Sequence, residues 1–285
     1  MEDKTIITYS GSSLKIFEGL KSRLEDGLPN ERIEWKRNFG RPSKSVAIRT
    51  KFVPLESASL SGDQRNASTL MGYPMLHTFW TDCTDVDVYK SIVKDEIANW
   101  FSTLRNAYGS SFDWMIILVE ISDARKSSKL LPRTSVLDKL KSEFSQAGKQ
   151  PERCVCLMDP SKFDSRSSES WQTLLHRFRL QLLNSYNKLL GRFEENMREQ
   201  REKRNSQSWN FCDYFLLQEQ LAFVYEMLEV YDEALVQYDE LDALFSQFVL
   251  NSNIMDGPYW LTMFSSDFNN WSGLSLRTDA ITNKK

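Results

Sequence analysis

The side chains best suited to metal or thiol chemistry in this chain are two histidines and four cysteines. His77 lies within a strand-like pattern and His176 within a long helical pattern, and neither has further ligand residues at a suitable spacing. Because a zinc site needs three or four such ligands, no metal site is predicted. Cys154 and Cys156 face the same side of one strand, and without a second Cys pair this pattern is typical of small packed side chains.

A loop with the right position to hold a phosphate group follows the first strand-like segment. Residues 10–13 (SGSS) match neither G-x-G-x-x-G nor G-x-x-x-x-G-K-[ST], and one glycine leaves few backbone amides free for an anion. Asp159 follows the last strand-like segment, at an edge where α/β proteins form sites, but it has no basic or nucleophilic companion. The Asp-Pro pair is instead typical of a turn. No catalytic residue and no cofactor are predicted.

The strongest charge feature is an acidic block. Residues 205–276 hold eleven Asp and Glu residues and no Lys or Arg, although the net charge of the whole chain is only −3. Such a block does not suit nucleic acid, so we expect it to bind protein partners. The candidate partner-binding acids lie on a helical segment at 231–250: Asp232, Glu233, Asp239 and Glu240. Alternatively, these acids pair with the basic residues at 198–204, and reversing their charge would then lower stability.

Two further segments combine aromatic and polar residues without a clear period. Residues 257–276 are dense in aromatic side chains and are expected to dock on the helical layer, or else to form a partner surface. The candidate partner-binding aromatics are Trp260, Phe264, Phe268 and Trp271. Residues 32–41 (RIEWKRNFGR) form a basic patch, which we interpret as a solvated loop rather than a membrane or acidic-partner contact.

Up to residue 165 the chain alternates strand-like and helix-like patterns, which is typical of an α/β domain with a mostly parallel sheet. The expected strands are at 5–9, 46–53, 76–81, 114–121 and 153–158. The expected helices are at 14–28, 88–108 and 136–144, the first of them ending before Pro29. Ser135 and Asp138 are placed to form a capping box on the third helix. We predict a three-layer α/β domain over residues 1–165.

After residue 165 the pattern becomes helical. Residues 169–204 contain no proline and keep a helical period, which predicts a helix about 54 Å long. The following LAFVYEMLEVYDEALVQYDELDAL resembles a tetratricopeptide unit, with helices at 213–228 and 231–250. Its second helix is expected to pack through an apolar side that includes Tyr231, Ala234 and Leu235. One unit cannot bury its own face, so residues 166–285 are predicted to begin an α-solenoid.

Composition sets the class of protein. Hydrophobic residues make up 41% of the chain and charged residues 26%, as in soluble globular proteins. No run of about 18 apolar residues is present, and the first residues, MEDKTIITYSGSS, lack the pattern of a secretory signal. Scattered cysteines suit a reducing compartment. We therefore expect a cytoplasmic protein.

Four segments carry a resemblance that covers nearly the whole chain. They are IEWKRNFGRPSKS at 33–45, LHTFWTDC with VYKSIVKDEI at 76–97, LLPRTSVLDKL at 130–140 and WNFCDYFLLQEQLAFVYEMLEVYDEALVQYDELDALFSQFV at 209–249. Together they closely resemble the family of subunit ten of the TRAPP II vesicle-tethering complex. The YDEALVQYDELDALFSQ run is far more specific than a generic tetratricopeptide match. Members of that family are much larger than this chain.

The resemblance implies a non-catalytic scaffold in a Golgi-associated complex that acts as a nucleotide exchange factor for Rab GTPases. It implies binding to other TRAPP subunits, including a small longin-like adaptor, and an indirect link to Rab GTPases and trans-Golgi membranes. The exchange site of the family belongs to the small core subunits, so no catalytic residue is expected here. An alternative from another class is an α/β nucleotide- or ligand-binding domain with enzymatic activity, which stabilisation by a nucleotide or metal would reveal.

Overall fold

The structure is a computed structural model that describes most of the chain. The described residues are 4–37, 42–57, 73–121, 135–144, 152–162, 164–204, 206 and 209–247. The chain divides into two compact units, one built from residues 1–63 and 72–187 and the other from residues 64–71 and 188–285. The units are described separately below.

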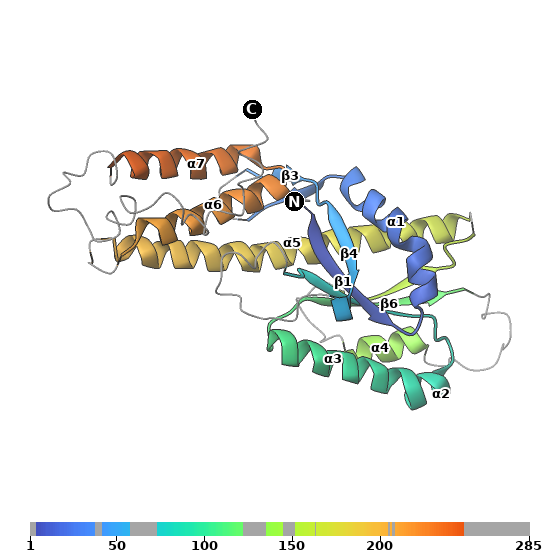
Figure 1. The fold of residues 1–285 in the computed structure, drawn as a ribbon. Helices are drawn as coiled ribbons and strands as arrows, with labels where there is room; N and C mark the ends of the chain where they lie inside the picture. Colours follow the sequence, from blue (N-terminus) through green and yellow to red (C-terminus); the bar gives the residue numbers. More distant parts are fainter. Residues whose placement is uncertain are drawn as a thin grey trace. The chain divides into compact units, whose positions relative to one another are not determined.

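The first unit is built on a parallel sheet (Figure 1). The strands are β1 (Thr5–Gly11), β4 (Thr50–Pro54), β5 (Leu76–Thr81), β6 (Trp114–Glu120) and β7 (Cys154–Met158). Their order across the sheet is β4-β1-β5-β6-β7, and every neighbouring pair is parallel. The central strand β5 is buried at every position, although half of its residues are polar. Hydrogen bonds inside the sheet satisfy two of these side chains: His77 Nδ1 lies 2.7 Å from Thr8 Oγ1, and Thr78 Oγ1 donates to the carbonyl oxygen of Thr8 at 2.8 Å. The sheet confirms the predicted α/β fold class.

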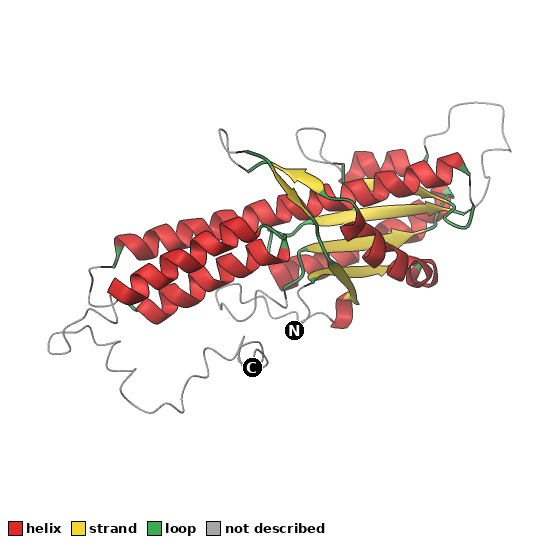
Figure 2. Cartoon of the chain, turned by 90° about the horizontal axis from the view of Figure 1, so that it is seen from above, coloured by secondary structure: helices red, strands yellow, loops and turns green. Residues whose placement is uncertain are grey.

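Helices cover both faces of this sheet (Figure 2). They are α1 (Leu14–Asn30), α2 (Val86–Val88), the π-helical turn η3 (Tyr89–Val93), α3 (Lys94–Tyr108), α4 (Val136–Phe144) and the first part of α5 (Ser165–Glu202). On one face, Phe79 of β5 shares a buried cluster with Trp100 of α3 and Leu140 of α4. On the other face, the ring centroids of Phe52 in β4 and Phe178 in α5 lie 5.8 Å apart. The unit therefore has three layers.

The strand expected at 46–53 is wrong, because two strands with different partners lie there. β3 (Lys44–Val46) pairs antiparallel with β2 (Ile33–Trp35), whereas β4 joins the main sheet. A continuous alternation of apolar and polar residues cannot reveal such a change of partner. The basic patch at 32–41 is likewise not simply a solvated loop, because it contains β2. Trp35 is buried there, and its Nε1 donates to Asn187 Oδ1 at 2.8 Å.

Helix α1 does not end before Pro29, as expected, but continues through it to Asn30. The buried guanidinium of Arg179 in α5 explains this difference. Its Nε donates to the carbonyl oxygen of Leu28 at 3.0 Å, and its Nη2 donates to that of Gly27 at 2.8 Å. These bonds satisfy carbonyl groups that a helix end leaves without partners. Arg179 thus caps a helix about 150 residues upstream, a contact that local sequence does not predict.

A glycine positions the carboxyl end of β1. Gly11 has a φ of +136°, and a Cβ atom at this position would lie 2.0 Å from the carbonyl oxygen of Trp80 in β5. Only glycine allows both this backbone conformation and this close approach of two backbones. The capping box on α4 is confirmed: the N–H of Asp138 donates to Ser135 Oγ at 3.1 Å, and the N–H of Ser135 donates to Asp138 Oδ2 at 3.1 Å.

The described residues of the second unit form three helices: the later part of α5, then α6 (Phe211–Met227) and α7 (Tyr231–Phe245). Figure 1 draws α6 between α5 and α7, and hydrogen bonds join it to both: Arg201 of α5 bonds to Tyr214, and Gln218 bonds to Glu240 of α7. Burial of its residues around most of its circumference fits this place. The helical part that follows the α/β layer is confirmed. None of the helices in the described ranges has an apolar stretch that would span a bilayer.

Candidate functional site

The loop at residues 10–13 is tied to the neighbouring strand through its serines. Ser12 Oγ donates to Thr81 Oγ1 at 3.2 Å, and Ser13 Oγ donates to Asp82 Oδ1 at 2.6 Å. The N–H of Asp82 donates in turn to Ser13 Oγ at 2.8 Å. These bonds occupy the hydroxyl groups of Ser12 and Ser13, and they place a carboxylate beside the loop. The arrangement is unfavourable for an anion.

The histidine and the thiols of this unit have structural contacts. His77 is buried, with its Nδ1 2.7 Å from Thr8 Oγ1 and its ring centroid 4.6 Å from that of Tyr108. Burial lowers the pKa of His77 to about 3, so its imidazole is neutral near pH 7. Cys154 Sγ donates to the carbonyl oxygen of Leu140 at 3.7 Å, and none of the four cysteines is in a disulfide. In the described ranges no three potential ligands gather to hold a metal.

Asp159 forms a turn, as its sequence context predicts. Its Oδ1 accepts hydrogen bonds from the N–H of Ser161 at 3.0 Å and from Ser161 Oγ at 2.6 Å. The hydroxyl bond lowers the pKa of this carboxyl below its usual value. Lys162 Nζ lies 3.9 Å away from the same side chain. These local contacts give Asp159 a structural role.

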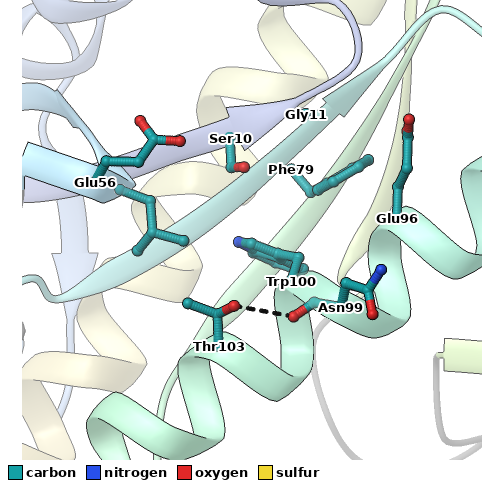
Figure 3. A pocket seen from close by; sticks show the side chains of 9 residues that line it. Ser10, Gly11, Glu56, Phe79, Glu96, Asn99, Trp100 and Thr103 are labelled. Atoms are coloured by element: carbon teal, nitrogen blue, oxygen red, sulfur yellow. Dashed lines mark hydrogen bonds between the residues drawn. The ribbon is translucent and has the colours of Figure 1, made fainter.

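A cavity of about 550 Å³ lies at the carboxyl end of β1, between the short 3₁₀ helix η1 (Leu55–Ser57) and α3 (Figure 3). Side chains from four elements line it, among them Ser10, Glu56, Phe79, Glu96, Trp100 and Thr103. Its size lies within the range of about 300 to 1,000 Å³ that is usual for ligand sites. No local pattern in the sequence signals this cavity, because its lining comes from segments far apart in the chain.

The outer side of α7 combines apolar and acidic residues. Tyr231, Leu235 and Val236 are 62%, 59% and 56% exposed, and Asp232 and Asp239 are exposed with them. The expectation that Tyr231 and Leu235 pack inside the hairpin is therefore wrong. Each helix of a hairpin has only one side toward its partner, and the buried side of α7 is made by Ala234 and Leu241 instead.

Among the candidate acids, Glu240 contacts both of the earlier helices. It forms an ion pair with Arg201 of α5, and its Oε2 accepts a hydrogen bond from Gln218 Nε2 at 2.8 Å. Arg201 Nε also donates to Tyr214 Oη at 2.7 Å. Burial raises the pKa of Tyr214, and the bond from Arg201 opposes that effect. For Glu240, the structure thus agrees with the alternative that these acids pair with the basic residues at 198–204.

The remaining predicted partner-binding residues are not all on the exposed side of α7. Glu233 is half-buried on α7. The four aromatic candidates lie outside the described residues: Trp260, Phe264, Phe268 and Trp271. Val236 was not among the predicted site residues, and its position directly after Leu235 widens the apolar strip on the outer side of α7. Sequence analysis also missed Gln218, which is fully buried, because an amide in an apolar helix gives no sign of its partner.

Comparisons with known proteins find similarity over almost the whole chain. Residues 1–204 match the family described as "Trafficking protein particle complex subunit 10-like, N-terminal". The chain is 46% identical to "Trafficking protein particle complex subunit 10" of Mus musculus, over 97% of this chain and 22% of that protein. It is 41% identical to the Drosophila melanogaster protein of the same name, over 97% of this chain and 24% of that protein.

A more distant similarity reaches plants. The chain is 30% identical to "Trafficking protein particle complex II-specific subunit 130 homolog" of Oryza sativa subsp. japonica, over 59% of this chain and 12% of that protein. The chain thus spans less than a quarter of the length of each of these three relatives.

Proposed function

The chain belongs to the trafficking protein particle complex subunit 10-like family, and we propose that it is a non-catalytic scaffold in a TRAPP II-type complex. It acts in vesicle-mediated transport at the Golgi, on the cytoplasmic side. It contributes to Rab nucleotide exchange by linking the complex-specific subunits to the core, through contacts that include a small longin-like adaptor. Membership of a family named for a multi-subunit complex supports an assembly role.

The observation that carries this proposal is the outer side of α7. Tyr231, Leu235 and Val236 expose three large apolar side chains on two adjacent turns, and Asp232 and Asp239 flank them. A compact apolar centre with a charged border is the usual composition of a protein–protein interface. Helical repeats bury such a side against the next helix or a partner. Four aromatic residues outside the described ranges are proposed to bind partners as well: Trp260, Phe264, Phe268 and Trp271.

The test is light scattering coupled to size exclusion, with the chain alone and mixed with each small TRAPP core subunit and the longin-like adaptor. We expect a stoichiometric complex with at least one of them. Leu235→Lys, at the centre of the outer side of α7, should weaken that complex by tenfold or more, as for a central interface residue. Asp232→Lys with Asp239→Lys should weaken it most at low salt.

Ile92→Lys is the matched control, because Ile92 is an exposed apolar residue of similar exposure in the other unit. It should leave the affinity unchanged. Equal binding by wild type and Leu235→Lys would contradict the use of α7. Binding to none of the subunits would contradict the attachment role of this chain.

A further inference from the structure

Exposed residues of α7 form one strip along the helix. Their positions recur every three or four residues, which places them on the same side of the helix. The strip consists of Asp232, Leu235, Val236, Asp239, Asp242 and Ala243. At about 1.5 Å per residue the strip is about 17 Å long, so a second helix of roughly three turns would cover it.

Acidic and apolar residues alternate along this strip, one helical turn apart. Asp232 lies in the first turn, the exposed side chains of Leu235 and Val236 lie in the second, and Asp239 lies in the third. Residues 205–276 contain no Lys or Arg, so no cation on α6 or α7 offsets these carboxylates. The strip therefore has an apolar centre with a carboxylate one turn away on either side.

This alternation decides which kind of partner can cover the strip. A wholly apolar surface would bury the two carboxylates without a counter-charge, which is strongly unfavourable. A second copy of α7 is disfavoured as well. If two copies packed antiparallel about Leu235 and Val236, Asp232 of each copy would lie opposite Asp239 of the other, and like charges across an interface repel. A partner with cations on either side of an apolar residue matches the strip.

We propose that the outer side of α7 binds a helix of another protein that carries Lys or Arg one turn before and one turn after an apolar residue. A helix fits because its side chains repeat every 5.4 Å or so along one side, as those of α7 do. The apolar residue packs on Leu235 and Val236, and the cations pair with Asp232 and Asp239. This inference rests on the function proposed above, since it specifies the partner of the same surface.

The test follows the methyl signals of Leu235 and Val236 by NMR of the full chain, assigned by their loss in Leu235→Ala and Val236→Ala. The probe is a helical peptide of alanine and glutamine that carries leucines at the centre of one side and a lysine one turn away on either side. A second peptide has glutamate in place of each lysine. We expect the lysine peptide to shift both signals in a saturable manner and the glutamate peptide to bind roughly tenfold more weakly.

Reversing the charge of α7 should exchange the two peptides. In Asp232→Lys combined with Asp239→Lys, we expect the glutamate peptide to bind and the lysine peptide to lose roughly tenfold in affinity. Asp26→Lys combined with Asp95→Lys is the matched control, because it reverses two exposed acids of the other unit and changes the net charge equally. This control should prefer the lysine peptide as wild type does. Thermal midpoints of all variants separate lost binding from lost folding.

The proposal is overturned if the lysine peptide leaves both methyl signals unmoved, if the two peptides bind wild type equally, or if charge reversal does not exchange their preference. A shift of the signals with protein concentration alone would also overturn it, because a second copy would then be the occupant. If a TRAPP subunit still bound wild type but not Leu235→Lys under any of these outcomes, the proposed function would stand while this inference failed.

Discussion

Gly11 has no Cβ atom, and this lets the backbones of β1 and β5 approach closely at the edge of the sheet where the cavity lies. Nearby, the buried His77 shares a hydrogen bond with Thr8 of the neighbouring strand. Both residues were visible in the sequence as members of chemically suggestive patterns, a phosphate-type loop and a possible ligand. In the structure both hold strands together, because the contacts they make come from segments about 70 residues away.

Gly11→Ala should lower the free energy of unfolding by about 3 kcal/mol, from the positive φ and the overlap with Trp80. Urea unfolding followed by tryptophan fluorescence measures the change. Gly19→Ala is the control, because a Cβ at this exposed position of α1 would meet nothing within 4 Å. It should raise stability by about 0.5–1 kcal/mol. A Gly11→Ala protein as stable as wild type would contradict the close approach.

His77 should make stability depend on pH. Its pKa in the folded protein is about 3, below the ordinary value near 6.5, so the unfolded chain binds the extra proton first as pH falls. Stability is therefore complete above about pH 6.5 and is lost toward pH 3, by up to about 1.4 kcal/mol per pH unit. Urea midpoints at several pH values test this. His77→Gln should flatten the slope, whereas His176→Gln, on the exposed side of α5, should keep it.

At the scale of elements, hydrophobic periodicity predicted a helix or strand correctly where that element packs against the same neighbour along its whole length. The capping box of Ser135 and Asp138 was predicted because all of its atoms lie within four residues. The single strand at 46–53 and the early end of α1 were wrong for the opposite reason. In those two cases a partner outside the element decides where it ends: β2 pairs with β3, and Arg179 caps α1 from about 150 residues away.

The turn between α6 and α7 contains a strained residue. Glu229 has a φ of +58°, in the left-handed region where a helix usually ends on glycine. Glu229→Gly should therefore raise the free energy of unfolding by about 1 kcal/mol. Glu229→Ala is the control, because alanine keeps the Cβ that causes the strain and should give little gain. Thermal unfolding measures both variants. If Glu229→Gly and Glu229→Ala shifted the unfolding midpoint equally, the backbone at residue 229 would not be strained.

At the scale of the whole molecule, α5 is the element common to both compact units, which divide between Asn187 and Lys188. The prediction of separate domains at 1–165 and 166–285 stays a prediction. Sequence showed that a long helix exists, because its period and lack of proline are local properties. It did not show that the first 23 residues of this helix belong to the α/β unit.

Gly191 lies on the exposed side of α5, and a Cβ there would meet nothing within 4 Å. Gly191→Ala should raise the free energy of unfolding by about 1 kcal/mol, because alanine restricts the unfolded chain and favours helix. Gly191→Pro should lower it by about 3 kcal/mol or more by breaking a helical hydrogen bond. Circular dichroism during urea unfolding measures both. Equal stability of the two variants would contradict an unbroken helix at this point.

The sequence by itself determined the family, the α/β class followed by helices, and the acidic character of residues 205–276. Motifs, periodicity and charge depend only on residue types and their spacing along the chain. Only the tertiary structure decided that Tyr231 and Leu235 face outward and that Glu240 pairs with Arg201. It also decided that Trp100 and Glu96 share a cavity with Glu56. These outcomes depend on which distant segments pack together, and packing is settled by the combined shape and charge of all of them.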